Sequence, residues 1–434
     1  MATSLPSSLR GTALRGTALR STALRLALSG ARRVPYVRRV PARIRFPLER
    51  HGVAPVARLA ATRERGEVVR FASLLGTRVW LVTGYDVART VLADSTSFAN
   101  DVRDLIGRQD RAPAERIGGL GMTDQPDHGR LRGVLTPYFT RRRLAELQAD
   151  IDRVVEAALD DMEAHGPEVD LVARFGFQVP FGVICDLLGM PEIDREAFRR
   201  QGAARFDLRD AGAGIFDTAA GTRQFLIDLV AEERRNPHLP DGLVARMVAD
   251  HGDRLDDVEL GGLADGVFLG GYETSASMLS LGTWVLLQHP EAWATLRAGE
   301  PAAVERVVDE LLRFVCPVQM AFPRVARHEV VVGDQVVRAG DIVLVSLTGA
   351  GRDPARHPAP EDFDPAREPV ATLAFGHGLH RCVGAELARM ELRTALVALA
   401  RRFPDLALAC DPADLRFTEL AIVHGVERLP VRLR

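Results

Sequence analysis

The ten residues from 375 to 384 read FGHGLHRCVG, and they stand immediately before a segment with strong helical periodicity. A cysteine near the start of a helix lies beside unpaired N–H groups and the positive end of the helix dipole, which lower the pKa of its thiol. Glycines on both sides of the cysteine leave room for a flat macrocycle, and an aromatic side chain can cover the sulfur. A lone cysteine is usually a small core residue, but the fixed positions are too many for a chance match. The segment therefore predicts an iron–thiolate centre at Cys382, with a frame of Phe375, Gly376, Gly378, His380 and Gly384.

The cysteines as a group form neither a disulfide nor a zinc pattern. The four of them, at positions 185, 316, 382 and 410, are far apart in the sequence, and none belongs to a Cys-x-x-Cys pair. This spacing argues against a disulfide scaffold and a zinc finger, and it favours a reducing, cytoplasmic setting. With 434 residues and 47% hydrophobic side chains, the chain can bury a large core.

Charge is distributed unevenly along the chain. All 56 basic residues are arginines, and the first 50 residues hold 11 of them against a single acid, Glu49. The remaining residues carry an excess of acids, which argues against a nucleic-acid partner. Residues 11–25 read GTALR, GTALR and STALR, and this five-residue spacing spreads the leucines around a helix instead of forming one stripe. We therefore expect residues 1–50 to be a basic, disordered extension, with a membrane-surface or transit-peptide role as the alternative, and residues 51–434 to form the domain.

Helical periodicity dominates the rest of the sequence. Alternating residues predict a strand at 78–84 and a strand–turn–strand unit at 328–347. The longest uncharged apolar stretch, 274–290, contains a glycine and a histidine and predicts a buried helix, not a transmembrane anchor. The sequence thus predicts a mainly α fold with a small β part. Helices are expected at 86–94, 143–166, 175–191, 222–236, 260–287, 290–298, 301–314 and 385–403.

The segment around Cys382 resembles the haem-binding loop of the cytochrome P450 family, and the resemblance extends over about residues 52–434. It implies the cytochrome P450 fold, haem b as the cofactor and Cys382 as the iron ligand. A second matching motif is Glu310-Leu-Leu-Arg313, about seventy residues before Cys382. Such an i,i+3 pair is usually a solvated helix face. In this family it is expected to meet Arg367 in a buried ion network that supports the fold.

The GGYETS motif at 270–275 resembles the oxygen-binding groove of the long I helix of the family. Small residues such as Gly270 let the helix approach the haem, and a hydroxyl that bonds back to the backbone can open the helix locally. The resemblance implies that Glu273 and Thr274 are an acid–alcohol pair that relays protons during oxygen activation. The alternative is an ordinary buried helix with one satisfied threonine. Tyr272 stands where many relatives carry another residue, and its effect is open.

The two carboxylates of a haem in a dry site need cationic or strong hydrogen-bond donors. His128 and Arg132 are four residues apart, which places them on one face of a helix. In a chain so rich in arginine, a surface role is the alternative for each arginine. The expected anchors of the haem propionates are His128, Arg132, Arg324 and His380.

The resemblance implies a haem-thiolate monooxygenase, which inserts one oxygen atom of O2 into an apolar small molecule by hydroxylation or epoxidation. The chain has no Gly-x-Gly-x-x-Gly motif after a strand and no length for a fused flavin reductase. Electrons are therefore expected from a separate ferredoxin and ferredoxin reductase. A peroxide-using enzyme and a haem-binding sensor are the alternatives, and the intact Glu273–Thr274 pair argues against both.

By the same resemblance, substrate contacts are expected from a loop at about 98–122, from the helix around 263–274, and from two shorter segments. An apolar wall with one polar group is the usual composition of a ligand pocket. Natural-product tailoring, a part of secondary metabolism, is one possible role, and steroid and fatty-acid oxidation stay open beside it. The expected wall residues are Val318, Gln319, Met320, Phe322 and Ile422, with Gln319 as the polar contact.

Overall fold

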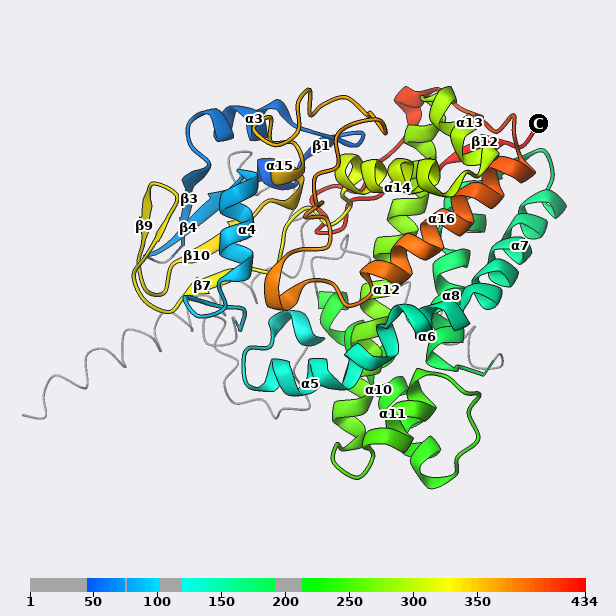
Figure 1. The fold of residues 1–434 in the computed structure, drawn as a ribbon, viewed down its shortest axis with the longest axis horizontal. Coiled ribbons are helices and arrows are strands. Elements are labelled where there is room, and N and C mark those ends of the chain that lie inside the picture. The colour runs from blue at the N-terminus through cyan, green and yellow to red at the C-terminus, as the bar shows by residue number, and fades with distance from the viewer. Residues whose placement is uncertain (1–44, 75, 102–118, 192–212) are drawn as a thin grey trace, which may run out of the picture.

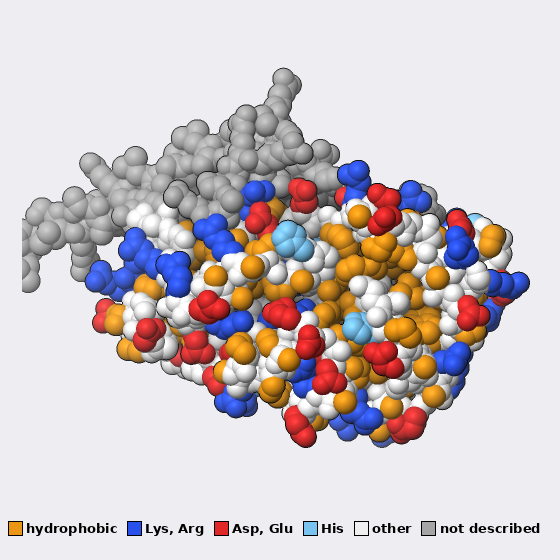
Figure 2. All heavy atoms as spheres, turned by 90° about the horizontal axis from the view of Figure 1, so that it is seen from above, with side chains coloured by type: hydrophobic (Ala, Val, Ile, Leu, Met, Phe, Trp, Pro, Cys, Tyr) orange, Lys and Arg blue, Asp and Glu red, His pale blue; other side chains and the backbone are white. Residues whose placement is uncertain are grey.

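The computed structural model describes residues 45–74, 76–101, 119–191 and 213–434. Figure 1 shows the long helices gathered on one side of the molecule and the main sheet on the other, so the predicted mainly α fold with a small β part is confirmed. The face in Figure 2 carries acidic and basic side chains interspersed with apolar ones. Among the residues that the structure describes, no helix is both long enough and apolar enough to cross a membrane.

The helical part is built around α12 (Asp257–Leu286), which is buried along most of its length. Its first turn is capped by Asp256, whose carboxylate accepts a hydrogen bond from the N–H of Glu259 at 2.8 Å. Helices α8, α10 and α16 all pack against it. The longer helices around it are α7 (Gln148–Ala164), α8 (Gln178–Leu188), α10 (Ala213–Arg235), α11 (Leu243–His251), α13 (Pro290–Ala298), α14 (Pro301–Val315) and α16 (Ala385–Arg402). The shorter ones are α3 (Ala57–Glu64), α4 (Tyr85–Ala93), α5 (Asp127–Leu135), α6 (Arg141–Glu146) and α15 (Leu347–Gly351), together with the π-helical turn η6 (Val172–Gly176) and the 3-10 turns η2 (Phe46–Leu48), η4 (Gly119–Met122), η5 (Thr136–Phe139), η8 (Gly378–His380) and η9 (Pro412–Asp414).

Helix α14 shows how local sequence sets these boundaries. The Glu300 side chain accepts hydrogen bonds from the N–H groups of Ala302 and Ala303, at 3.1 and 2.7 Å, and Pro301 fills the first helical position. The helix ends at Cys316, which adopts the left-handed conformation with φ 38°. This turn sends the chain into the segment that precedes the main sheet.

The main sheet has the strand order β3-β4-β10-β7-β5. Its central pair, β4 and β10, is parallel, and the other pairs are antiparallel. The predicted unit over 328–347 is right for β8 and β9, which form a hairpin, but β10 leaves them and pairs with β4 instead. The strands of this sheet are β3 (Val68–Leu74), β4 (Thr77–Val82), β5 (Phe98–Ala99), β7 (Arg324–Ala326) and β10 (Ile342–Val345). Smaller sheets join β1 (Arg50–His51) to β2 (Ala54–Pro55), β8 (Val330–Val332) to β9 (Gln335–Val337), and β11 (Ala407–Leu408) to β12 (Pro430–Arg432) and β6 (Glu168–Asp170).

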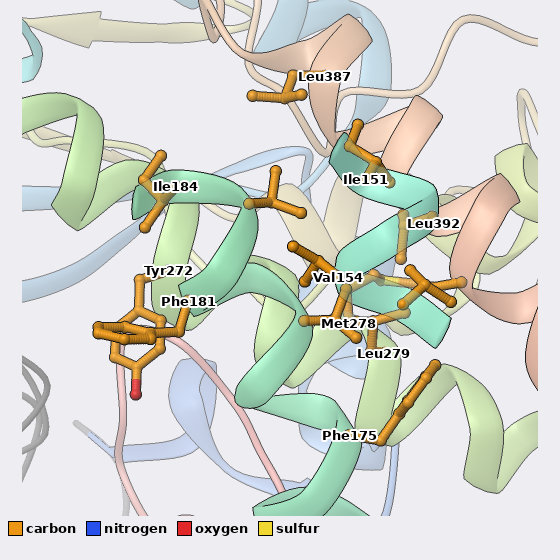
Figure 3. Packing of buried hydrophobic residues seen from close by; sticks show 14 of the residues in the cluster. Ile151, Val154, Phe175, Phe181, Ile184, Tyr272, Met278, Leu279, Leu387 and Leu392 are labelled. Carbon is orange, nitrogen blue, oxygen red and sulfur yellow. The ribbon is translucent and has the colours of Figure 1, made fainter. Parts of the chain in front are cut away.

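The side chain of Tyr272 points from α12 into an aromatic cluster (Figure 3). Its ring stacks on that of Phe268, one turn earlier, and meets Phe177 and Phe181 edge-on with centroid separations of 5.4 and 5.7 Å. Such contacts add to the burial of apolar area. Tyr272 is therefore a packing residue between α12 and α8, which answers the question that the sequence left open.

Residues just before the expected domain start at residue 51 contact the rest of the structure. Phe46 is buried and packs with Leu59 and Leu81, while the guanidinium of Arg50 donates to the carbonyl oxygens of Val315 and Cys316. The sequence did not indicate these contacts, because the excess of arginine in residues 1–50 is typical of an exposed extension. Residues 1–44, which make up the rest of the predicted extension, lie outside the described residues.

Candidate functional site

The loop before α16 carries Cys382, and its Gly378 packs against the end of α4. The N–H of Cys382 donates to the carbonyl of Phe375 at 2.9 Å, which closes the loop. Gly376 and Gly378 have φ of 67° and 71°, a conformation that favours glycine. A Cβ at Gly378 would lie 2.7 Å from the carbonyl oxygen of Leu92, so this glycine is required by the packing of the loop on α4.

The surroundings of the Cys382 sulfur act on its pKa in opposite directions. The residue is accessible on one side. Desolvation raises the pKa of the thiol, while a backbone hydrogen bond from Gly384 and the charges of Arg132, Arg381 and Arg389 lower it. Desolvation is the larger effect, so the thiol pKa of the chain alone is raised. The expected lowering of this pKa by the helix N-terminus is thus opposed by desolvation of the sulfur.

The four expected propionate anchors come from three elements, because His128 and Arg132 both lie on α5, and the structure brings two of the four into contact. The rings of His128, on α5, and His380, on η8, have centroids 4.3 Å apart. His128 is fully buried, and among the described residues neither of its ring nitrogens has a hydrogen-bond partner, nor does Nδ1 of His380. Buried polar groups without partners are rare in folded proteins. These nitrogens are therefore suited to bind a polar group that belongs to a ligand.

The two arginines of the set have no carboxylate partner among the described residues. Arg324, on β7, is 3% exposed, and its guanidinium donates only to the carbonyl of Phe322 at 3.0 Å. Burial lowers its pKa to about 10, so it is charged at neutral pH. Desolvation also lowers the pKa of Arg132, and the nearby sulfur of Cys382 partly offsets this. One buried and one half-buried cation, neither paired with a carboxylate of the described residues, fit the two carboxylates of a haem together with the imidazoles.

The motif on α12 presents an acid and an alcohol side by side. Thr274 Oγ1 donates to the carbonyl of Gly270 at 2.6 Å, one turn earlier. Glu273 is half-buried and forms no hydrogen bond with the described residues, and desolvation raises its pKa to about 8. Of the two glycines, Gly271 packs against Ile184 on α8, whereas a Cβ at Gly270 would have no neighbour within 4 Å. The open side of this turn is therefore at Gly270 and Thr274.

The ion network of α14 is assembled away from the α12 motif. Arg313 Nε and Nη2 donate to the two carboxylate oxygens of Glu310, each at 2.7 Å, and both side chains are buried. Arg367 Nε lies 3.5 Å from Glu310 Oε1, and the N–H of Asp364 donates to the same oxygen at 2.9 Å. The remaining donors of Arg313 bind the carbonyl oxygens of Gly351, Pro360 and Asp362. This network ties α14 to the segment that leads to the cysteine loop.

The expected substrate contacts separate into two groups. Phe322 and Ile422 are 44% and 62% exposed, which is unusual for large apolar side chains. Val318 and Met320 are half-buried and pack against the core clusters of the sheet. Gln319 is buried, and its amide hydrogen bonds all go to the protein, so its expected role as the polar substrate contact does not fit. Most of the expected loop at 98–122 lies outside the described residues.

The sequence analysis missed a buried acid on α16. Glu391 is 3% exposed, one of its carboxyl oxygens has no partner, and a hydrogen bond links it to Ser275 on α12. Burial raises its pKa to about 8. The helical spacing of the sequence could have indicated this burial. Glu391 is four residues from both Leu387 and Ala395, so it lies on the same buried face of α16.

A cysteine with arginine and imidazole donors nearby that have no carboxylate partner among the described residues is the arrangement expected of a haem-thiolate protein. The family model of cytochrome P450 matches residues 302–408. The chain is 39% identical over 376 residues to cytochrome P450 165C4 of Amycolatopsis orientalis, which corresponds to 85% of this chain and 91% of that protein. It is 35% identical over 386 residues to the mycinamicin IV hydroxylase/epoxidase of Micromonospora griseorubida, or 88% and 96% of the two chains.

The fold agrees with these relatives. The solved structure of P450 StaH from glycopeptide antibiotic A47934 biosynthesis is 39% identical and superposes with a TM-score of 0.80 over 89% of this chain and 99% of that one. The protein therefore belongs to the cytochrome P450 family of haem-thiolate monooxygenases. The predicted family, fold and class of enzyme are confirmed.

Proposed function

We propose that this protein uses O2 to hydroxylate or epoxidise an apolar small molecule, with haem b as its cofactor and a ferredoxin and its reductase as the electron source. The observation that carries the proposal is the pair on α12, where the Thr274 hydroxyl is bonded to the Gly270 carbonyl beside the Glu273 carboxyl. Activation of O2 requires protons to be delivered at the reacting site, and an acid–alcohol pair supplies them. An enzyme that uses peroxide, or a protein that only binds a gas, has no need of this pair.

Each cofactor-binding residue has a separate task in this proposal. Cys382 ligates the iron, with Phe375 and Gly376 in the loop around it. His128, Arg132, Arg324 and His380 hold the two propionates. This is supported by the unpaired ring nitrogens of His128 and His380 and by the two arginines, which have no carboxylate partner among the described residues. When bound, the haem supplies the redox chemistry that splits O2 and oxidises a carbon centre.

The chain itself supplies protons and positions the substrate. Glu273 is protonated at neutral pH and donates through the Thr274 hydroxyl, while Gly270 leaves the turn open on that side. Phe322 and Ile422 contact the apolar part of the substrate and so determine which carbon is presented. The network of Glu310, Arg313 and Arg367 supports the fold without taking part in the chemistry.

The substrate class that we propose is a natural product of secondary metabolism. The support is the names of the relatives, one of which acts on mycinamicin IV while another belongs to glycopeptide antibiotic biosynthesis. Steroids and fatty acids belong in the same screen, and a spin-state shift of the haem on addition of a compound identifies candidates. Selective binding of a steroid or a fatty acid, with no response to natural products, would overturn this choice of class.

The first test is the absorption spectrum of the purified, dithionite-reduced protein with carbon monoxide. A strongly red-shifted Soret band is expected from thiolate ligation, and Cys382→His should lose it while Cys410→Ser keeps it. A histidine-type band in the wild type would contradict the site. Product formation should then require ferredoxin, reductase and NADPH together, and turnover driven by peroxide alone would favour the alternative enzyme.

A further inference from the structure

The guanidinium of Arg50, on β1, has no carboxylate partner among the residues that the structure describes. Its Nε donates to Oε1 of Gln319 at 2.8 Å. The other four donors bind acceptors that are all uncharged, so every N–H of the guanidinium is used. Burial lowers its pKa to about 10, which leaves it charged at neutral pH. The uncharged acceptors are the carbonyl oxygens of Val53, Val315 and Cys316, at 3.1, 2.5 and 2.7 Å, and the Thr348 hydroxyl at 2.6 Å.

Gln319 extends this set of bonds to two further segments. Its Nε2 donates to the carbonyl of Leu48 at 3.1 Å and to that of Ala421 at 2.7 Å. Its backbone N–H donates to the carbonyl of Ile422 at 3.0 Å. The amide therefore connects the segment around Leu48, the segment after α14 and the segment 421–424. The side chain of Gln319 is 1% exposed, so none of these bonds competes with bulk water.

The two segments that Gln319 joins both carry an exposed apolar side chain. Phe322 follows Gln319 by three residues, and Ile422 follows Ala421 directly. The backbones of these segments form a bridge between Val318 and Val423, which sets their register. The side-chain bonds of Gln319 add a second constraint, because they fix both backbones relative to Arg50.

We propose that Arg50 and Gln319 are a positioning pair that sets the spacing of segments 318–322 and 421–424, and thereby decides which ligands fit against Phe322 and Ile422. This inference rests on the proposed function, in which those two side chains contact the substrate. The pair acts on selectivity at a distance and touches neither the haem nor the reacting atoms. A lysine cannot replace Arg50, since an ammonium group has three donors and no planar fork.

Gln319→Glu is the most specific test. A carboxylate keeps the bond to Arg50 Nε, but it cannot donate a hydrogen bond. It therefore repels the carbonyl oxygens of Leu48 and Ala421 and loosens the segment 421–424. The probes are imidazole and 4-phenylimidazole, both of which ligate haem iron. Only 4-phenylimidazole carries a second ring that extends away from the iron into the substrate pocket. The dissociation constants are read from the Soret shift of the haem-loaded, full-length protein.

The expected result is that Gln319→Glu changes the 4-phenylimidazole constant by about tenfold, the equivalent of one hydrogen bond, and the imidazole constant by less than about twofold. Gln288→Glu is the matched control, because Gln288 also donates to a carbonyl, that of Trp284, but lies at the end of α12. It should change neither constant. Equal constants in Gln319→Glu and wild type would overturn the proposal, as would a parallel change of both.

A second variant covers the case in which Gln319→Glu does not bind haem. Gln319→Asn keeps the amide but is shorter by one methylene group, so it cannot reach Arg50, Leu48 and Ala421 together, and the same selective change is expected. Failure of both variants to fold would overturn the proposal, because the pair would then support the whole fold. Failure of the proposed function is distinct, since it would show as a missing thiolate-type band in the wild type.

Discussion

The carboxylate of Glu310 accepts two hydrogen bonds from the guanidinium of Arg313, three residues later on α14, and both side chains are nearly inaccessible. Removing one charge leaves the other buried without its partner. We expect Glu310→Gln to lower the free energy of unfolding by about 3–5 kcal/mol and to reduce haem content. Urea unfolding and the haem-to-protein absorbance ratio measure the two effects.

The control for this variant lies on the same helix. Glu305 is exposed on α14, so Glu305→Gln should change the free energy of unfolding by less than about 1 kcal/mol. If Glu310→Gln were as mild as Glu305→Gln, the ion network would not support the fold.

The Thr274 hydroxyl is expected to control how electrons are used. Thr274→Ala should bind haem normally but divert electrons to hydrogen peroxide, so that the product formed per NADPH falls severalfold. Thr283→Ala is the matched control, because Thr283 makes the same bond to a carbonyl one turn earlier, 2.8 Å from Leu279, but is buried further along α12. The measurement is the ratio of product and peroxide to NADPH consumed. Wild-type coupling in Thr274→Ala would argue against the proton relay.

The raised pKa of Glu273 predicts a specific pH profile. Desolvation raises this pKa to about 8, so the carboxyl holds its proton below pH 8 and loses it above. Product formed per NADPH should therefore decline as the pH rises through about 8. Glu273→Gln should be low and flat over the same range, because an amide does not titrate. An unchanged decline in this variant would assign the titration to another group.

His357 is expected to make the fold sensitive to acid. It is 1% exposed, and neither ring nitrogen has a hydrogen-bond partner in the part of the chain that the structure describes. Desolvation and the charge of Arg313 lower its pKa to about 4. The unfolded chain binds a proton near pH 6.5, while the folded protein does so only near 4, so stability is lost as pH falls between these values. The loss at pH 4 amounts to at most about 3 kcal/mol.

His357→Phe should remove this contribution and keep the edge-on contact with Tyr85. Its stability should therefore fall less between pH 6.5 and 4 than that of the wild type, in thermal or urea unfolding. His165→Phe, at an exposed position after α7, is the control and should follow the wild type. A wild-type acid profile in His357→Phe would contradict the prediction.

Local signals account for the elements that the sequence predicted best. Helix α13 begins and ends as expected, because Pro290 fills its first position and Gly299, with φ 73°, ends it. The partner of β10 could not be predicted in this way. It pairs with β4, more than 250 residues earlier, and only the packing of the whole domain brings the two together.

The site residues show the same limit. The frame around Cys382 and the Glu310–Arg313 motif could be found because their spacing is fixed along the chain. Gln319 was misinterpreted, because a polar residue in an apolar segment looks the same whether it binds a ligand or Arg50. The acid of Glu391 and the buried charge of Arg50 escaped notice, because charged residues are exposed by default and their partners are distant in sequence.

The turn of α12 from 272 to 275 sends its side chains in separate directions. Tyr272 packs on α8, Thr274 bonds along the helix, and Ser275 contacts Glu391 of α16. Each position therefore contacts a different neighbour. We expect a substitution at 272 to stiffen or loosen the packing of α12 on α8 while the bond of Thr274 to Gly270 is kept.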